Sequence, residues 1–120
     1  MAKILVVDDS QTQVQSITKI LEKHGHETIT AEDGDSAVSV ARSELPDLIL
    51  MDVVMPGLNG FQATRHITKT EGTQHIPVVM LSSKDQDTDK VWAERQGASG
   101  YIIKPATEND LIATINKFLS

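Results

Sequence analysis

The chain has 120 residues, which fits one domain around a single core, and it contains no cysteine, which excludes disulfides and thiolate metal sites. It carries 17 acidic side chains against 11 Lys and Arg, and its net charge of −6 opposes binding to nucleic-acid phosphates and to anionic lipid headgroups. No apolar stretch approaches the about 20 residues of a membrane span, so we expect a cytoplasmic protein that binds neither nucleic acids nor membranes.

Short apolar runs alternate with amphipathic segments along the first half of the chain. Residues 3–9 are rich in Ile, Leu and Val, as expected of a strand buried on both faces. Residues 10–24 repeat apolar side chains at helical spacing, and Gly25 stands where a helix ends. The other elements expected in this half are an edge strand over 26–31, a helix after the Asp33-Gly34 turn and a third strand over 47–52.

The second half continues this alternation and finishes on a helix. The expected elements are a helix over 60–70, a strand over 76–83, a helix that ends at Gly97, a strand over 100–105 and a last helix from Ala106. Thr107 and Asp110 have the spacing of a capping box at the start of that helix. The pattern predicts an α/β fold, with a five-stranded parallel sheet in the order 2-1-3-4-5 and five helices wound on both faces. We expect a single domain over residues 1–120 with no output domain.

Polar side chains stand at the ends of four of the five predicted strands. The first strand ends in Asp8 and Asp9, the third in Asp52, the fourth in Ser82 and the fifth in Lys104. Each has a plainer explanation, because Asp commonly caps helices or forms turns, and Ser or Lys can end a strand in water. Parallel strands end at one edge of a sheet, however, so these side chains are expected to meet there. Their coincidence favours a common site.

The residue types at this edge indicate phosphoryl chemistry. Three carboxylates in one crevice repel one another unless a cation neutralises them. Mg²⁺ suits such oxygen ligands and keeps positions open for water and a phosphate oxygen. Lys104 and the Ser82 hydroxyl add groups that bind an oxyanion. A phosphoryl group in line with Asp52 could then be attacked by that carboxylate to give an aspartyl phosphate.

The same residues resemble a known family. The pair Asp8-Asp9, the block LILMDVVMPGLNG, the strand VVMLSS and the segment GASGYIIKP stand in the order and at the spacing of the receiver domains of two-component response regulators. The resemblance runs from Lys3 to the C-terminus. The segments MPGLNGFQATR and KDQDTDKVWAERQGA further resemble single-domain, chemotaxis-regulator-like receivers of type IV pilus and twitching-motility systems.

This resemblance implies the flavodoxin-like receiver fold and a signalling function. Asp52 would accept a phosphoryl group from a histidine kinase, and the chain would switch protein–protein interactions rather than act as an enzyme. Mg²⁺ would be bound by Asp9, Asp52 and the backbone carbonyl of Val54, with Asp8 acting through a water. The implied partners are the histidine kinase and an unidentified protein target, and the chain is expected to be a monomer.

The resemblance also implies a switch at the ends of strands four and five. Ser82 would bond a phosphoryl oxygen, and Tyr101 would then change rotamer. Lys104 would pair with the phosphoryl group, aimed inward by a cis bond to Pro105. Neither the lifetime of the phosphorylated state nor the identity of the target follows from these residues.

Other interpretations stay open at this point. An aspartate-nucleophile phosphohydrolase shares the acid, metal, lysine and hydroxyl, but such enzymes usually carry a second acid two residues after the nucleophile, where this chain has Val54. A passive interaction module and a phosphate sink for a shared kinase are two further alternatives. Trp92, the only Trp, either covers the sheet, which we favour, or anchors a partner. The four histidines lack ligand spacing, so no zinc site is expected.

Overall fold

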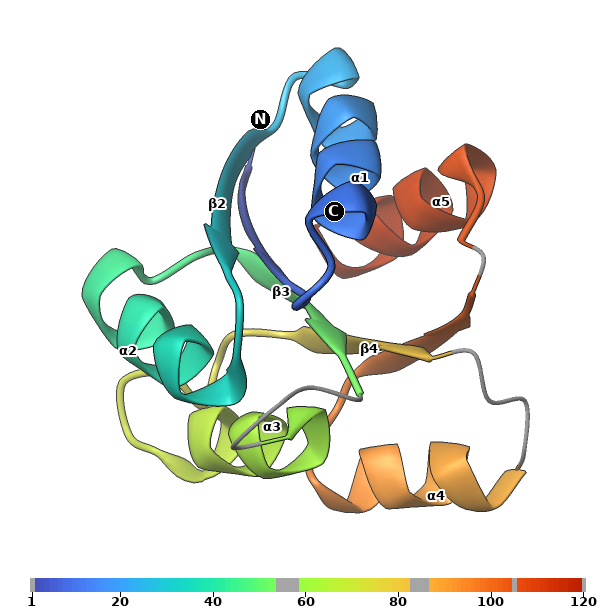
Figure 1. Ribbon diagram of the computed structural model, residues 1–120. Helices are drawn as coiled ribbons and strands as arrows, with labels where there is room; N and C mark the ends of the chain where they lie inside the picture. The colour runs from blue at the N-terminus through green and yellow to red at the C-terminus, as the bar shows by residue number, and fades with distance from the viewer. Residues whose placement is uncertain (1, 54–58, 83–86, 105, 120) are drawn as a thin grey trace.

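The computed structural model describes residues 2–53, 59–82, 87–104 and 106–119. Strands and helices alternate along these residues (Figure 1). The strands are β1 (Lys3–Val7), β2 (Glu27–Ala31), β3 (Leu48–Asp52), β4 (Val78–Ser82) and β5 (Gly100–Ile103). The helices are α1 (Gln11–Lys23), α2 (Gly34–Glu44), α3 (Gly60–Lys69), α4 (Asp87–Arg95) and α5 (Glu108–Leu119).

All five strands are parallel and form one sheet in the order β2-β1-β3-β4-β5. The central strands β3 and β4 are buried along their whole length, whereas β2 at the edge is partly exposed. This confirms the predicted fold, including the edge position of the weaker second strand. The physical reason is that only a strand covered on both faces needs a continuous apolar run.

Helices cover both faces of the sheet. Figure 1 shows α1 and α5 on one face and α2, α3 and α4 on the other. Alternate residues along β1, β3 and β4 belong to two separate cores, one beneath each helical layer. Among the described residues, none of the helices is long and apolar enough to cross a membrane. Because both faces of the sheet are packed against helices, the sheet is rigid and holds the residues at its carboxyl edge in fixed positions.

Single residues set the helix ends, and Gly25 and Gly97 are the two that the sequence predicted. Ser10 and Asp33 precede α1 and α2, and each side chain accepts a hydrogen bond from the backbone N–H three residues later. Gly25 and Gly97 follow α1 and α4 with φ of +86° and +94°, which side chains rarely adopt. These ends direct the chain back into the next strand.

Candidate functional site

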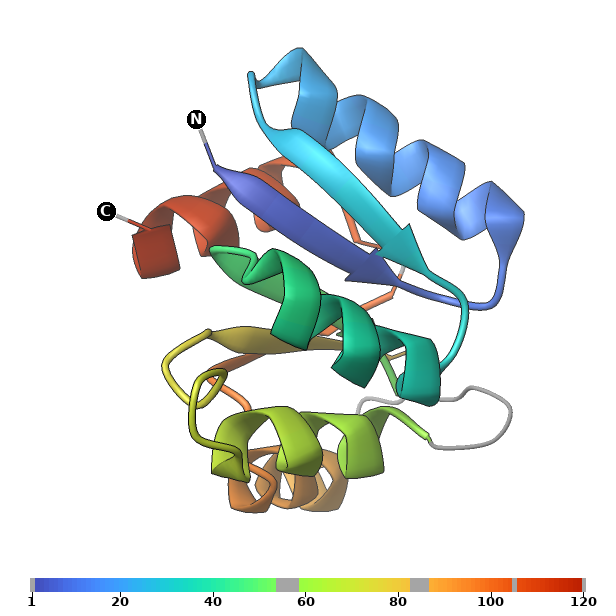
Figure 2. The same cartoon turned by 90° about the vertical axis from the view of Figure 1, so that its left-hand side faces the viewer.

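The parallel sheet brings four polar strand ends to one edge. Asp8 directly follows β1, and Asp52 is the last residue of β3, which pairs with β1. Ser82 is the last residue of β4, and Lys104 directly follows β5. In Figure 2 the arrowheads of β1 and β2 point toward this edge. Residues separated by most of the chain thus become neighbours.

Three carboxylates form the acidic part of the site. One oxygen from each of Asp8, Asp9 and Asp52 lies within 4.8 Å of the others. Asp8 and Asp52 are buried, with exposed fractions of 2% and 7%, whereas Asp9 is exposed. The backbone N–H of Ser10 donates to Asp8 Oδ1 at 2.9 Å, which orients the Asp8 side chain. The cluster is closed on the sheet side and open on the side of Asp9.

Lys104 supplies the cation of the site. Its Nζ lies 2.9 Å from Asp52 Oδ1 and 3.2 Å from Asp8 Oδ2. Its backbone N–H donates to the carbonyl of Ser82 at 2.7 Å, which ties the lysine to the end of β4. Burial alone would lower the pKa of Lys104, but the hydrogen bond to Asp52 and the charges of Asp52 and Asp8 outweigh burial, and its pKa is raised. The amine therefore stays protonated and directed at Asp52.

Charge is not balanced around Asp52. Burial raises the pKa of Asp52, the hydrogen bond from Lys104 opposes that rise, and the charges of Asp8 and Asp9 add to it. The net direction is upward, with burial as the largest cause. Among the described residues, three carboxylates beside the one ammonium group of Lys104 also leave the cluster with a net negative charge. A divalent cation bound by oxygen ligands would remove this imbalance, and the donor set therefore fits Mg²⁺.

The two residues predicted to act as a switch lie on neighbouring strands. Ser82 is buried at the end of β4, with 4% exposure, on the strand that pairs with β3. Tyr101 is half-buried on β5 and packs against the core beneath α2, α3 and α4. The predicted metal contact through the Val54 carbonyl and the predicted cis bond to Pro105 lie outside the described residues.

Gly60 is a site residue that the sequence analysis did not identify. It begins α3, and its backbone N–H donates to the carbonyl of Val53 at 3.0 Å. A Cβ atom on Gly60 would lie 2.1 Å from the carbonyl oxygen of Asp52. The start of α3 is therefore in direct contact with the backbone that carries Asp52, and only glycine leaves room for this contact. The second Gly of the PGLNG segment was the available signal.

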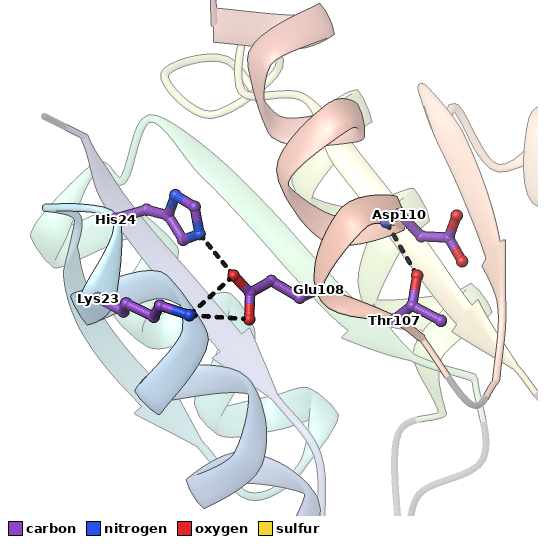
Figure 3. Close-up of polar contacts among 5 residues, drawn as sticks. All are labelled: Lys23, His24, Thr107, Glu108 and Asp110. Atoms are coloured by element: carbon purple, nitrogen blue, oxygen red, sulfur yellow. Dashed lines mark hydrogen bonds and ion pairs between the residues drawn. The ribbon is translucent and has the colours of Figure 1, made fainter.

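A second unpredicted feature joins α1 to α5 (Figure 3). Glu108, the first residue of α5, accepts from Lys23 Nζ at 3.2 Å and lies 3.0 Å from His24 Nε2. The hydrogen bond with His24 and then that with Lys23 lower the pKa of Glu108. Thr107 accepts from the backbone N–H of Asp110 at 3.1 Å, which is one of the two hydrogen bonds of the predicted capping box. Together these contacts fix the first turn of α5, shortly after Lys104.

Trp92 does not cover the sheet, so that interpretation was wrong. The indole is 53% exposed, and the Arg95 guanidinium lies 5.7 Å from its ring centroid. Among residues 91–95, the part of α4 whose side chains are described, the buried side chain is Ala93, which is 1% exposed and belongs to the core. The helix approaches the sheet through this small residue, and Trp92 is left on the surface.

Comparisons with known proteins agree with this geometry. Residues 4–116 match the response regulator receiver domain family. The chain is 56% identical to PilH of Pseudomonas aeruginosa over 120 residues, covering 100% of this chain and 99% of PilH. It is 39% identical to the phosphate regulon regulator PhoB of Escherichia coli over 94% of this chain but only 49% of PhoB.

Solved structures show the same fold. The chemotaxis protein CheY4 of Vibrio cholerae superposes with a TM-score of 0.94 and 32% identity, covering 99% of each chain. The receiver domain of a sensor histidine kinase from P. aeruginosa, solved with a magnesium ion coordinated in its active site cleft, gives a TM-score of 0.91 at 28% identity, covering 98% of this chain and 97% of that one. The chain therefore belongs to the response regulator receiver domains, the family that its strand-end residues predict.

Proposed function

We propose that Asp52 accepts a phosphoryl group from the phosphohistidine of a histidine kinase in a Mg²⁺-dependent reaction, and that this modification changes the affinity of the chain for a partner protein. The observation that carries the proposal is the contact of Lys104 with Asp52 at 2.9 Å inside a cluster of three carboxylates. A buried acid that is paired with an ammonium group and open to one metal is suited to phosphoryl transfer. Receiver domains are phosphoacceptor modules, so membership in the family disfavours the phosphohydrolase alternative.

The residues present would hold the metal without rearrangement of the sheet. Asp9 and Asp52 would be direct ligands together with the Val54 carbonyl, and Asp8 would act through a water. When bound, Mg²⁺ would supply positive charge that neutralises the phosphoryl oxygens during transfer. The solved receiver domain with coordinated magnesium supports this assignment by similarity.

The chain's own groups account for the transfer itself. An Asp52 carboxylate oxygen attacks phosphorus, the bond from phosphorus to the histidine nitrogen breaks, and the imidazole leaves with the electron pair of that bond. Lys104 exchanges part of its contact with Asp52 and Asp8 for a contact with the phosphoryl group. Ser82 donates its hydroxyl to a phosphoryl oxygen, and Tyr101, on the adjacent strand, is proposed to respond by changing rotamer.

Similarity to PilH supports a role in a pilus or twitching-motility system. The identity of 56% extends over both chains almost completely. Within that role, the chain would act as an effector that binds a target when phosphorylated. A coupling of about 1–3 kcal/mol between phosphorylation and target binding is typical of such switches. A phosphate sink would instead take up and lose phosphate with no dependent partner.

Intact-mass measurement after incubation with acetyl phosphate tests the proposal. We expect one phosphoryl adduct on the wild-type chain in Mg²⁺, none in EDTA, and none on the Asp52→Asn variant in Mg²⁺. The asparagine keeps the size of the side chain but is a poor nucleophile, so it isolates the chemistry from packing. An adduct that persists in Asp52→Asn, or its absence from the wild-type chain, would overturn the assignment.

A further inference from the structure

A hollow between α3 and α4 lies outside the phosphoacceptor site. Its volume is about 370 Å³, and it is lined by Asn59, Phe61, Gln62, Arg65, Trp92 and Gln96, which we call the α3–α4 groove. Figures 1 and 2 show the two helices side by side on the same face of the sheet. None of the residues proposed for phosphoryl transfer lines the groove. It therefore needs an explanation of its own.

The described side chains around the groove include cations and no acids, although the chain as a whole is acidic. Gln62 and Arg65 also line a second hollow, which continues along α3 past His66 and Lys69. No carboxylate is among the described residues that line either hollow. The net charge of the chain is −6, so a concave surface whose described lining is only cationic and neutral differs locally from the chain as a whole. Such a surface attracts an acidic ligand.

The nearest described acid on α4 faces elsewhere. Glu94 lines a different hollow, together with Ala98 and Tyr101 on the β5 side of the helix. Trp92 and Gln96 are on the side toward α3. Among the described side chains of α4, the acidic Glu94 and the groove residues Trp92 and Gln96 thus lie on different sides of the helix, and no described lining residue cancels the charge of Arg65.

An aromatic anchor lies within this positive surface. Trp92 is more than half exposed, the half-buried Phe61 lines the groove beside it, and Arg95 lies against the indole ring. Core packing does not explain the position of Trp92, because Ala93, and not Trp92, belongs to the core among the described side chains of α4. Exposed Trp and Arg are the residue types that most often dominate protein interfaces. The groove offers both charge and an apolar contact.

The two walls of the groove are joined at one end. Thr68 Oγ1 donates to the carbonyl of Gln96 at 2.7 Å, which joins the end of α3 to the end of α4. A Cβ on Gly97 would lie 2.5 Å from Thr68 Oγ1, so the ends of the two helices are in close contact. A preformed site loses little entropy when a ligand binds.

We propose that the α3–α4 groove binds an acidic segment of a partner protein, whose carboxylates pair with Arg65 and Lys69 and whose apolar side chain contacts Trp92. Nucleic acid is disfavoured as the ligand because the remaining surface of the chain repels phosphates. A second copy of this acidic chain is disfavoured because bringing two chains of like net charge together costs energy. The inference does not require phosphorylation at Asp52.

Selection from displayed random peptides of about a dozen residues tests this proposal with the unphosphorylated full chain. We expect the selected peptides to be rich in Asp and Glu and to carry an aromatic or aliphatic residue. The strongest peptide is then synthesised without Trp, so that the change in emission of Trp92, the only Trp, measures its affinity. Arg65→Glu should weaken binding by about tenfold, because it replaces attraction with repulsion, and added salt should weaken wild-type binding.

Lys19→Glu is the matched control. Lys19 is exposed on α1, on the opposite face of the sheet, and this variant changes the net charge by the same amount as Arg65→Glu. It should bind the peptide as the wild type does, and circular dichroism should show both variants folded. Failure to select acidic peptides, or equal weakening by both variants, overturns the proposal. Tighter binding of an oligonucleotide than of the peptide, or self-association in sedimentation that Arg65→Glu abolishes, overturns the choice of an acidic partner segment.

Discussion

The contact between Gly60 and the backbone of Asp52 makes a prediction that opposes helix propensity. Gly60 is in the first turn of α3, where Ala is normally the better residue by up to about 1 kcal/mol. In this structure, however, a Cβ would lie 2.1 Å from Asp52 O and 2.8 Å from the Cα of Val53. Both neighbours are backbone atoms of the strand end, so neither can rotate away. Gly60→Ala should therefore destabilise the chain.

The size of the effect follows from the distances. Ordinary C···O contacts lie at about 3.3 Å or more, so α3 must withdraw by about 1 Å. That shift would break the hydrogen bond of 3.0 Å from Gly60 N to Val53 O, which contributes about 1 kcal/mol. Overpacking adds about 1–3 kcal/mol. After the gain in propensity, we expect a net loss of about 2 kcal/mol and a Tm lower by about 8 °C.

Thermal unfolding followed by circular dichroism, with and without Mg²⁺, measures this effect. Gly25→Ala makes the same chemical change where no atom lies within 4 Å of the new Cβ, and only its φ of +86° is unfavourable. That control should lose about 1–2 kcal/mol through backbone strain and keep the wild-type response to Mg²⁺. Gly60→Ala should lose stability and weaken the response to Mg²⁺, because the Asp52 backbone moves. A Gly60→Ala variant as stable as the wild type would refute the reasoning.

Three further predictions concern the charges. In EDTA, Asp52→Asn should raise the free energy of unfolding at pH 7 by about 1 kcal/mol, as urea unfolding would measure. The pKa of Asp52 is raised in the folded state, so the contribution of Asp52 to stability is lost as pH rises. The stability that the variant gains over the wild type should therefore shrink toward pH 4. Mg²⁺ at about 100 times its Kd should stabilise the wild type by about 2.7 kcal/mol and Asp9→Asn clearly less in the same titration; equal stabilisation would exclude Asp9 as a ligand. Glu108→Gln should speed hydrogen exchange in the first turn of α5 at neutral pH, because it weakens the contacts with Lys23 and His24. Because the pKa of Glu108 is lowered, the wild type should lose this protection only when the solution is acidic enough to protonate Glu108. Unchanged exchange in the variant would contradict a stabilising role for the contacts of Glu108 with Lys23 and His24.

Much of the fold follows from patterns that are local in sequence. The apolar runs identify β1, β3 and β4, because parallel strands that are buried on both faces carry continuous apolar residues instead of alternating polar ones. Gly25 and Gly97 mark helix ends through the backbone geometry of single residues. The proximity of Asp8, Asp52 and Lys104 could be predicted from these elements, since the strand order alone places their ends together.

The features that the sequence did not reveal depend on how helices pack. Glu108 meets His24 across 84 positions, and no short-range pattern relates them. Trp92 lies in α4, which has few apolar residues, so the periodicity of the sequence did not show which face of this helix is buried. The role of Gly60 depends on an atom of Asp52 that only the folded backbone brings close. Each of these features depends on how separate elements pack together, and the conformational preference of a single segment does not determine it.

The junction of Thr68 with Gln96 and Gly97 limits how α4 can move. A helix that is held at one end can rotate as a rigid body about that end. The greatest displacement of α4 then falls on its first turn, the end that follows β4 and Ser82 in the chain. A rearrangement at Ser82 would swing the helix about Gly97, and Trp92, between the two ends, would travel a shorter arc.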